Sequence, residues 1–210
     1  YSGGCAANAA IDLAKLGAKA SVIGMAGNDG FGSFMRSELE KYGVDTDGLY
    51  MNDEVGTSAS VVLVDKGGER AFMHSVGANG AFAAAHVNYG IIDRANIVFV
   101  AGCMLMPRFD GADCAAVLKK SKEMGKITVL DTAWDDKGNW MKTLAPCMPF
   151  IDYFLPSIEE AEQLSGKTAP EEIADVFFDM GVRSVVIKLG GRGCYMRENK
   201  AFYFNAINTT

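Results

Sequence analysis

Short, almost uninterrupted apolar runs alternate with helical patterns along most of this chain, and no other feature restricts the fold as strongly. Runs of this kind are typical of strands that are buried on both faces, as the strands of parallel sheets are. We expect them at residues 20–24, 97–100, 127–130, 153–155 and 184–189. Parallel neighbours need long crossover connections, usually helices, so the alternation predicts a layered α/β protein.

The segments between these runs carry helix signals. In residues 171–180 the apolar positions recur with the spacing i, i+3, i+4 and i+7, which places them on one helical face. Gly125 and Gly181 stand where the C-terminus of a helix favours a residue of positive φ. We expect helices at residues 5–16, 31–42, 111–124, 159–164 and 171–180.

One stretch departs from this rhythm. Residues 57–64 and 69–75 are rich in β-branched and aromatic side chains, and only a short turn with two glycines separates them. Because such a turn closes a hairpin and no helix intervenes, these strands cannot join the parallel layer. We expect a projecting hairpin lid at residues 57–76 and a second hairpin at residues 193–204. Since no linker or repeat interrupts the rest, we assign residues 1–210 to one main domain.

Composition disfavours several functional classes. The net charge is −6 and no Lys/Arg cluster occurs, so the chain is poorly suited to bind nucleic acid or an anionic membrane. The longest apolar run, at residues 97–106, is about half the length of a membrane-spanning helix. The five cysteines are scattered without a Cys-x-x-Cys pair, which indicates reduced thiols and a cytoplasmic protein.

Two common nucleotide-binding motifs are disfavoured by the helices and strands expected around them. Residues 161–168 match a loosened phosphate-loop pattern, but that loop must open a helix, and here Gly166 follows one. We therefore interpret Gly166 as a helix C-cap. The Gly-x-Gly-x-x-Gly fingerprint of dinucleotide-binding folds follows none of the expected strands, which disfavours a nicotinamide-dependent dehydrogenase.

Candidate binding residues in the first half of the chain lie in or near glycine-rich turns. Gly3 and Gly4 open the first expected helix and let a ligand approach the backbone, and Asn8 follows with an amide that can bond hydroxyls. Asp29 can bond a hydroxyl or cap the next helix. Asn79 can belong to a simple turn or to the hinge of the lid. A purely structural role stays open for each of them.

Further candidates follow strands expected in the second half of the chain. Asp131 ends one strand, where ligands bind in open α/β sheets, although it can equally serve as a helix cap. Ser157 and Glu160 have the spacing of a capping box, a structural role that competes with ligand binding. Lys188 ends another strand, and the glycines at residues 190–193 can admit a nucleotide or simply turn the chain into the second hairpin.

Taken in order, these motifs resemble those of the ribokinase-like (PfkB) carbohydrate kinases. The series is Gly-Gly-x-x-x-Asn, Gly-x-x-Gly-x-Asp-x-Phe-Gly, a Thr-led hairpin that ends in Gly-Ala-Asn, Pro-x-x-x-Glu-Ala, and Leu-Gly-x-x-Gly. The motifs stand at residues 3–17, 24–32, 57–79, 156–161 and 189–193, so the resemblance runs nearly end to end. It implies a three-layer αβα fold with a mainly parallel sheet and a small β-hairpin lid.

The resemblance also implies an activity, the transfer of the ATP γ-phosphoryl group to a primary hydroxyl of a sugar. The implied cofactors are ATP and Mg²⁺, with K⁺ as a further candidate ion, and the implied assembly is a homodimer through the lid. Together with the strand-end position, it gives substrate-binding roles to Gly3, Gly4, Asn8, Asp29, Asn79 and Asp131. Nucleotide-binding roles fall to Lys188, Gly190 and Gly193, and Ser157 and Glu160 would organise Mg²⁺ and phosphate through water.

Some positions depart from the family pattern. Cys5 stands where ribokinases carry a lysine, which argues against ribose, and Ser157 replaces the asparagine of Asn-x-x-Glu. The segment at residues 131–135 lacks the usual Asn and Arg, so the substrate subclass stays open. The family's catalytic Gly-Ala-Gly-Asp, with the catalytic base, is expected directly after Thr210, so we expect residues 1–210 alone to have little or no turnover.

Two other functions stay open from the sequence. One is a nucleoside or vitamin kinase of the same fold, which would need a larger apolar or aromatic pocket. The other is a non-catalytic ligand-binding or regulatory relative, which the Ser157 replacement keeps open.

Overall fold

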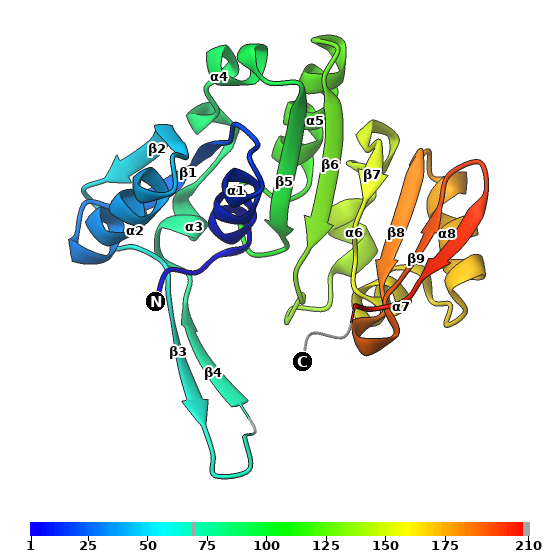
Figure 1. The fold of residues 1–210 in the computed structure, drawn as a ribbon. Helices are drawn as coiled ribbons and strands as arrows, with labels where there is room; N and C mark the ends of the chain where they lie inside the picture. Colours follow the sequence, from blue (N-terminus) through cyan, green and yellow to red (C-terminus); the bar gives the residue numbers. More distant parts are fainter. Residues whose placement is uncertain (69, 208–210) are drawn as a thin grey trace. The chain divides into compact units, whose positions relative to one another are not determined.

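The alternation of strands and helices is confirmed in a computed structural model, which describes residues 1–68 and 70–207 (Figure 1). The described residues fall into two compact units. The first contains Tyr1–Asn88 with Met106–Arg108, and the second contains Tyr89–Leu105 with the described residues from Phe109 onward. The assignment of the whole chain to one main domain stays a prediction.

The first unit contains a parallel strand pair, helices and a hairpin. Its elements are α1 (Cys5–Lys15), β1 (Ser21–Gly27), α2 (Gly30–Lys41), β2 (Asp45–Asn52), β3 (Ala59–Val64), β4 (Arg70–Ser75) and α3 (Gly77–Ala81). β1 and β2 pair in parallel, and apolar side chains from α1, β1, α2 and β2 form the core. The strand expected at residues 20–24 is β1, which continues to Gly27, whereas β2 was not expected from the sequence.

The second unit is built on one mixed sheet. Its elements are α4 (Tyr89–Arg94), β5 (Ile97–Cys103), α5 (Ala112–Glu123), β6 (Ile127–Thr132), α6 (Trp140–Leu144), β7 (Tyr153–Phe154), α7 (Ile158–Ser165), α8 (Pro170–Asp179), β8 (Ser184–Lys188), β9 (Cys194–Arg197) and β10 (Ala201–Phe204). The strand order is β10-β9-β8-β7-β6-β5. Strands β5 to β8 run parallel, and the hairpin β9–β10 extends the sheet in antiparallel fashion.

The apolar runs that form β6, β7 and β8 are interior strands of this sheet, whereas the run that forms β5 lies at its edge. Leu130, Phe154 and Val185, from three neighbouring strands, are fully buried. The sheet contacts α5 through β6 and α8 through β8. Because β5 to β8 are parallel, their carboxyl ends lie along the same edge of the sheet, which is the edge where the sequence places its ligand candidates.

The hairpin β3–β4 forms a two-stranded sheet of its own and extends away from the other elements of the first unit (Figure 1). Its antiparallel register pairs Ser60 with His74, and their side chains meet at 2.8 Å from Ser60 Oγ to His74 Nδ1. The expectation that this stretch stays outside the parallel layer is confirmed. Glu69, which we expected at the start of the second strand, lies outside the described residues. The function of the β3–β4 hairpin as a lid stays a prediction.

The helix ends follow the glycine pattern. Gly125 and Gly181 have positive φ directly after the last turns of α5 and α8. Gly166 caps α7 in the left-handed conformation, so the loosened phosphate-loop pattern at residues 161–168 closes a helix instead of opening one. This confirms the interpretation of Gly166 as a C-cap.

All five cysteines are free, and Cys103, Cys114 and Cys147 are fully buried. Hydrogen bonds to Cys103 and Cys147, together with burial, raise the pKa of the Cys114 thiol well above its usual value. These thiols therefore serve as apolar filler in the core of the second unit. Over residues 1–68 and 70–207, no helix has the length and apolar character needed to cross a membrane.

Candidate functional site

The carboxyl edge of the sheet in the second unit gathers polar side chains from three parallel strands. Asp131 is the penultimate residue of β6, Lys188 ends β8, and Ser157 caps the helix that follows β7. A backbone bridge joins Ser157 to Lys188, and the Lys188 N–H donates to the Pro156 carbonyl at 2.9 Å. The structure thus brings together the candidate residues that the sequence placed at these strand ends.

An ion pair crosses this edge. Lys188 Nζ lies 2.6 Å from Asp131 Oδ1, although β7 stands between their strands in the sheet. Burial raises the pKa of the Asp131 carboxyl, and the hydrogen bond from Lys188 offsets part of this effect. The Lys188 side chain is 48% exposed, whereas the Asp131 side chain is 19% exposed, so solvent reaches the lysine more easily than the carboxylate. An exposed, tethered ammonium is suited to an incoming anion.

Ser157 and Glu160 form the capping box of α7. The Ser157 N–H donates to Glu160 Oε2 at 2.9 Å, and the Glu160 N–H donates to Ser157 Oγ at 3.2 Å. Thr132 Oγ1, at the end of β6, donates a further hydrogen bond to Glu160 Oε2 at 2.9 Å. The structural interpretation of this pair is therefore confirmed, and Thr132 is an additional member that sequence reasoning missed. Its only signal was its position after Asp131 at a strand end.

These residues also bear on the expected Mg²⁺. Within the described residues no three His, Cys, Asp or Glu side chains are grouped so that they could hold a metal ion. Mg²⁺ in phosphoryl-transfer sites is usually held by one or two carboxylates together with phosphate oxygens and water. Glu160 fits this limited role, because its Oε2 is fixed by Ser157 and Thr132 at the sheet edge.

The glycines after β8 have different surroundings. Gly190 opens a short 3₁₀ turn with φ of 59°, and a Cβ there would meet no atom within 4 Å. A Cβ at Gly193, whose φ is 92°, would overlap the carbonyl oxygen of Phe204 on the neighbouring strand. Open space at Gly190 is compatible with close approach of a ligand, whereas glycine at Gly193 is required by packing of the hairpin itself.

In the first unit, Gly4 and Asn8 lie at the start of α1. Gly4 is the N-cap residue with φ of 97°, a conformation that favours glycine, and its carbonyl accepts the Asn8 N–H at 3.0 Å. Gly3 precedes it, and a Cβ there would meet nothing within 4 Å. Asn8 lines a hollow of about 230 Å³ together with Ser2, Ile11, Asp12, Lys15, Glu38 and Tyr42.

Asp29 joins α2 to the root of the hairpin. Its Oδ1 accepts hydrogen bonds from the Gly32 N–H at 2.8 Å and from Thr57 Oγ1 at 2.7 Å, and its Oδ2 accepts the Thr57 N–H at 2.8 Å. The hydrogen bonds from Thr57 and Gly32 lower the pKa of the Asp29 carboxyl. The capping role is thus realised, and Thr57 is a partner that the sequence did not reveal.

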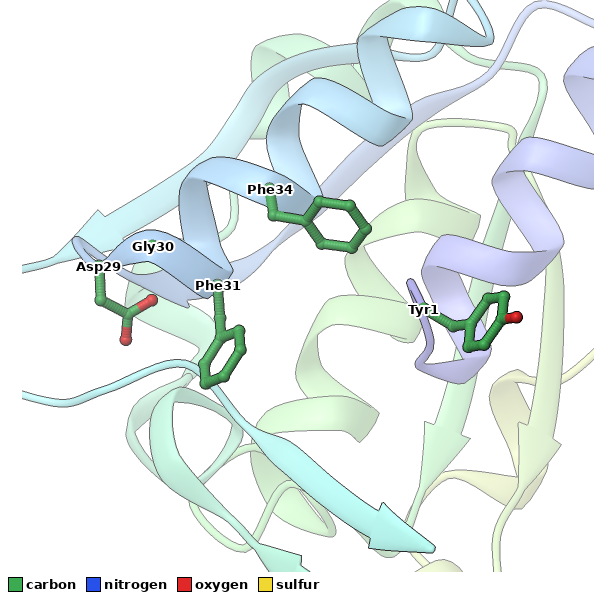
Figure 2. Close-up of a pocket in the computed structure, with 5 residues that line it drawn as sticks. All are labelled: Tyr1, Asp29, Gly30, Phe31 and Phe34. Carbon is green, nitrogen blue, oxygen red and sulfur yellow. The ribbon is translucent and has the colours of Figure 1, made fainter.

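Asp29 also borders a larger hollow of about 610 Å³ (Figure 2). Phe31 and Phe34 project into this region from the first turns of α2, and Tyr1 lies across from them. Asn8 does not line this hollow, so Asn8 and Asp29 border separate depressions of the first unit.

Asn79 lies in α3, directly after the hairpin. Its N–H donates to Ser58 Oγ at 3.0 Å, and Ser58 Oγ in turn donates to the Val76 carbonyl. The next anchor is the Ala78 N–H, which donates to the Gly56 carbonyl at 2.9 Å. Asn79 is therefore at the hairpin root, in a short helix instead of the simple turn that Asn-Gly favours.

The model of the pfkB family carbohydrate kinases matches residues 1–210. The chain is 28% identical to a ribokinase of Haemophilus influenzae over an alignment of 227 positions, gaps included, which covers 99% of this chain and 69% of that protein. The chain spans roughly two thirds of the length of the curated relatives it matches. It covers 69% of this ribokinase and 63% of a 2-dehydro-3-deoxygluconokinase of Bacillus subtilis.

Solved structures show the same fold. The ribokinase of Arabidopsis thaliana complexed with ribose and ATP superposes with a TM-score of 0.82 at 23% identity, covering 98% of this chain and 67% of that one. An E. coli protein described as a ribokinase II, in complex with ATP and Mg²⁺, superposes with a TM-score of 0.81 at 22% identity, covering 99% and 68%. The expected ribokinase-like α/β fold is confirmed. The chain belongs to the pfkB family of carbohydrate kinases.

Proposed function

We propose that this protein transfers the γ-phosphoryl group of ATP to a primary hydroxyl of a sugar. The observation that carries the proposal is the half-exposed Lys188 side chain, tethered by Asp131 at the carboxyl edge of the sheet, in a chain that matches carbohydrate kinases throughout. Relatives named ribokinase, fructokinase and 2-dehydro-3-deoxygluconokinase support a sugar as the acceptor. Structural relatives solved with ATP support the donor.

Phosphoryl transfer needs alignment of the reacting groups and neutralisation of phosphate charge more than covalent work by the protein. Lys188 is suited to pair with a phosphate oxygen, because a lysine acts as a flexible point charge. Gly190 leaves the backbone open for a nucleotide, and Gly193 shapes the turn that presents it. Asp131 is suited to orient Lys188 and to accept a hydrogen bond from a sugar hydroxyl.

Mg²⁺, when bound with the nucleotide, supplies charge neutralisation at the phosphates. Glu160 would help to hold the ion through water, and Ser157 and Thr132 hold the Glu160 carboxylate in place. This outer position agrees with the capping box, because a carboxylate that already accepts two hydrogen bonds is well fixed for orienting water.

Residues of the first unit are also proposed to bind sugar hydroxyls. Gly3 and Gly4 leave the backbone accessible, and the Asn8 amide offers both donors and an acceptor for hydroxyls. Asp29 and Asn79 are proposed to act through the hairpin root, which they fix through Thr57 and Ser58.

The hairpin at residues 57–76 is proposed to act as the lid and as the contact for a second copy of the chain. An isolated two-stranded sheet is marginally stable in water, and this one exposes a row of large apolar side chains. The exposed residues are Val61, Val62, Leu63, Val64 and Met73.

A substrate panel tests the proposed function. The natural full-length protein is incubated with ATP and Mg²⁺ against ribose, fructose, 2-dehydro-3-deoxygluconate and a set of nucleosides, and ADP release is measured together with the mass of the product. We expect one sugar to gain a single phosphate at its primary hydroxyl, located by NMR. Phosphorylation of a nucleoside in preference to every sugar, or no turnover with any acceptor, contradicts the proposal.

A further inference from the structure

The loop between β6 and α6 holds Trp134, and the second tryptophan of residues 1–210, Trp140, is the first residue of α6. Trp134 follows Asp131 by three residues, and the Ala133 N–H donates to the Cys103 carbonyl at 2.8 Å, which ties the start of the loop to β5. Trp134 therefore follows the carboxyl edge of the sheet, in the same connection as the residue for which the sequence predicts substrate binding.

This loop is held in a defined shape by Asp135. Its Oδ2 accepts the N–H groups of Asn139 at 2.6 Å and Trp140 at 2.8 Å, and its Oδ1 accepts the Lys137 N–H at 3.0 Å. Asp135 is buried, and Trp140 adopts a positive φ of 33°, which is uncommon for a residue other than glycine. Such a loop presents its exposed side chains with little freedom.

The two indole rings meet edge to face. Their centroids lie 4.9 Å apart with an interplanar angle of 80°. Trp140 is half-buried and supports the contact, whereas Trp134 remains 51% exposed. If the pair served only to cover the loop, the outer ring would bury more of its surface by lying flat against the loop. A supported ring that shows half of its surface to solvent is instead the form of a binding platform.

The charges around the ring indicate what it binds. The segment carries Asp131, Asp135 and Asp136 against one basic residue, Lys137. Asp131 is paired with Lys188, and Asp135 accepts backbone N–H groups of its own loop. Carboxylates accept hydrogen bonds from neutral hydroxyl groups. An aromatic face beside carboxylates therefore suits a polyhydroxyl ring, which has apolar C–H faces and a polar rim.

We propose that Trp134 is a specificity-determining residue that stacks on the C–H face of the sugar, beside Asp131. The inference rests on the proposed function for the identity of its ligand. It adds a residue that selects ring-shaped acceptors over open-chain ones, because only a closed ring offers a flat face to the indole.

Binding without turnover gives the primary test, because Trp134 and Trp140 are the two tryptophans of residues 1–210 and each can be replaced in turn. The natural protein is titrated with ribose, fructose and ATP separately, in the wild type, in Trp140→Phe and in Trp134→Phe. We expect the sugar that is turned over to change the emission of Trp140→Phe, which retains Trp134 as a reporter. The emission of Trp134→Phe should change little.

Kinetics give the second readout. We expect Trp134→Ala to raise the KM for the sugar about tenfold, Trp134→Phe to keep it within about twofold, and neither to change the KM for ATP. Phe202→Ala, which removes a ring of similar exposure from β10, is the matched control and should leave both constants unchanged. If Trp134→Ala also lowers the unfolding midpoint, Trp134→Phe, which keeps an aromatic ring at this position, separates the effect on stability from the effect on binding.

The outcomes separate the two proposals. Sugar turnover with an unchanged sugar KM in Trp134→Ala contradicts this inference alone, and so does an effect confined to ATP, which would assign the ring to the adenine base. A wild type that neither phosphorylates nor binds any sugar of the panel contradicts the proposed function and this inference together.

Discussion

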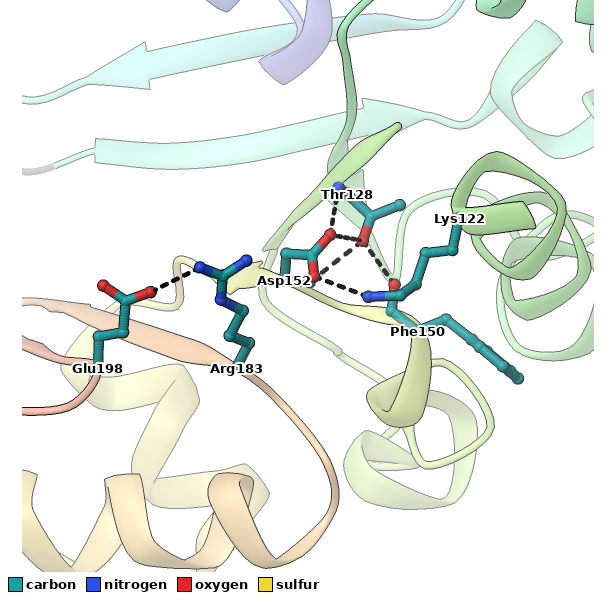
Figure 3. A network of polar contacts seen from close by, with 6 residues as sticks. All are labelled: Lys122, Thr128, Phe150, Asp152, Arg183 and Glu198. Carbon is teal, nitrogen blue, oxygen red and sulfur yellow. Dashed lines mark hydrogen bonds and ion pairs between the residues drawn. The ribbon is translucent and has the colours of Figure 1, made fainter. Parts of the chain in front are cut away.

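Lys188 Nζ lies 2.6 Å from Asp131 Oδ1 at the carboxyl edge of the sheet, and a second pair of the same chemistry lies at the opposite edge. There Lys122 Nζ lies 2.7 Å from Asp152 Oδ1, just before β7 begins (Figure 3). Ligands of open α/β sheets bind beyond the carboxyl ends of strands. The same interaction is therefore expected to serve ligand binding at one edge and stability at the other.

The Asp152 pair provides a prediction about acid stability. Burial opposes ionisation of Asp152, but hydrogen bonds from Lys122 and Thr128 outweigh it, so the pKa of the carboxyl is lowered. A group with a lowered pKa contributes stability above its unfolded-state pKa and loses that contribution as pH falls through the folded-state pKa. We expect Asp152→Asn to reduce the free energy of unfolding by about 2 kcal/mol at pH 7.

Urea denaturation at pH 7 and at about pH 3.5 measures this difference, since the unfolded-state pKa of aspartate is near 3.9. The gap between wild type and variant should narrow at the lower pH, because the unfolded wild-type chain takes up a proton that the folded ion pair resists. A gap of equal size at both values would show that the carboxylate charge is not what stabilises the network.

The glycines after β8 predict two different responses to alanine. At Gly193 a Cβ would overlap the Phe204 carbonyl, and the positive φ adds strain, so Gly193→Ala should cost about 3 kcal/mol or more. At Gly190 only the positive φ of 59° opposes alanine, so the cost should be about 1 kcal/mol. Denaturant unfolding of both variants tests this order, and equal costs would contradict it.

Asp29 predicts a local response in the hairpin root. Asp29→Asn keeps an oxygen that can accept the Gly32 N–H and cap α2, but it can place an amide donor opposite the Thr57 N–H. We expect hydrogen exchange at the Thr57 amide to accelerate while the Gly32 amide keeps its protection. Asp65→Asn, which alters the contact with the Gly67 N–H at the hairpin tip, is the control and should leave the Thr57 amide unchanged. Equal protection of Thr57 in wild type and Asp29→Asn would contradict the anchor.

Sequence patterns were informative where one periodicity ran through a whole element. The buried runs at residues 127–130 and 184–189 became β6 and β8, because strands covered on both faces leave an uninterrupted apolar signature. The strand β2 escaped prediction, since its first residues, Asp45-Thr46-Asp47, are polar and partly exposed. α6, a five-residue helix fixed by Asp135, is too short to show a helical period.

The candidate site was predictable residue by residue, but not as a set of contacts. Strand-end positions pointed to Asp131 and Lys188, yet nothing local indicates that side chains 57 positions apart form an ion pair across an intervening strand. Thr132 and Thr57 were missed for the same reason, because a hydroxyl gains its partner only once the chain is folded. The capping box of Ser157 and Glu160 was legible, since both partners lie within one helical turn.

The central claim is that the Lys188–Asp131 ion pair binds phosphate whereas the Lys122–Asp152 ion pair stabilises the fold. Lys188→Met and Lys122→Met, in the natural full-length protein, remove one ammonium group from each of two ion pairs of nearly equal length. The decisive measurement is kcat/KM for ATP in both variants, with the unfolding midpoint recorded alongside. The account predicts a loss of about 100-fold in Lys188→Met and little change in Lys122→Met, which should instead unfold at a lower temperature. A Lys188→Met protein with the wild-type kcat/KM for ATP would contradict it.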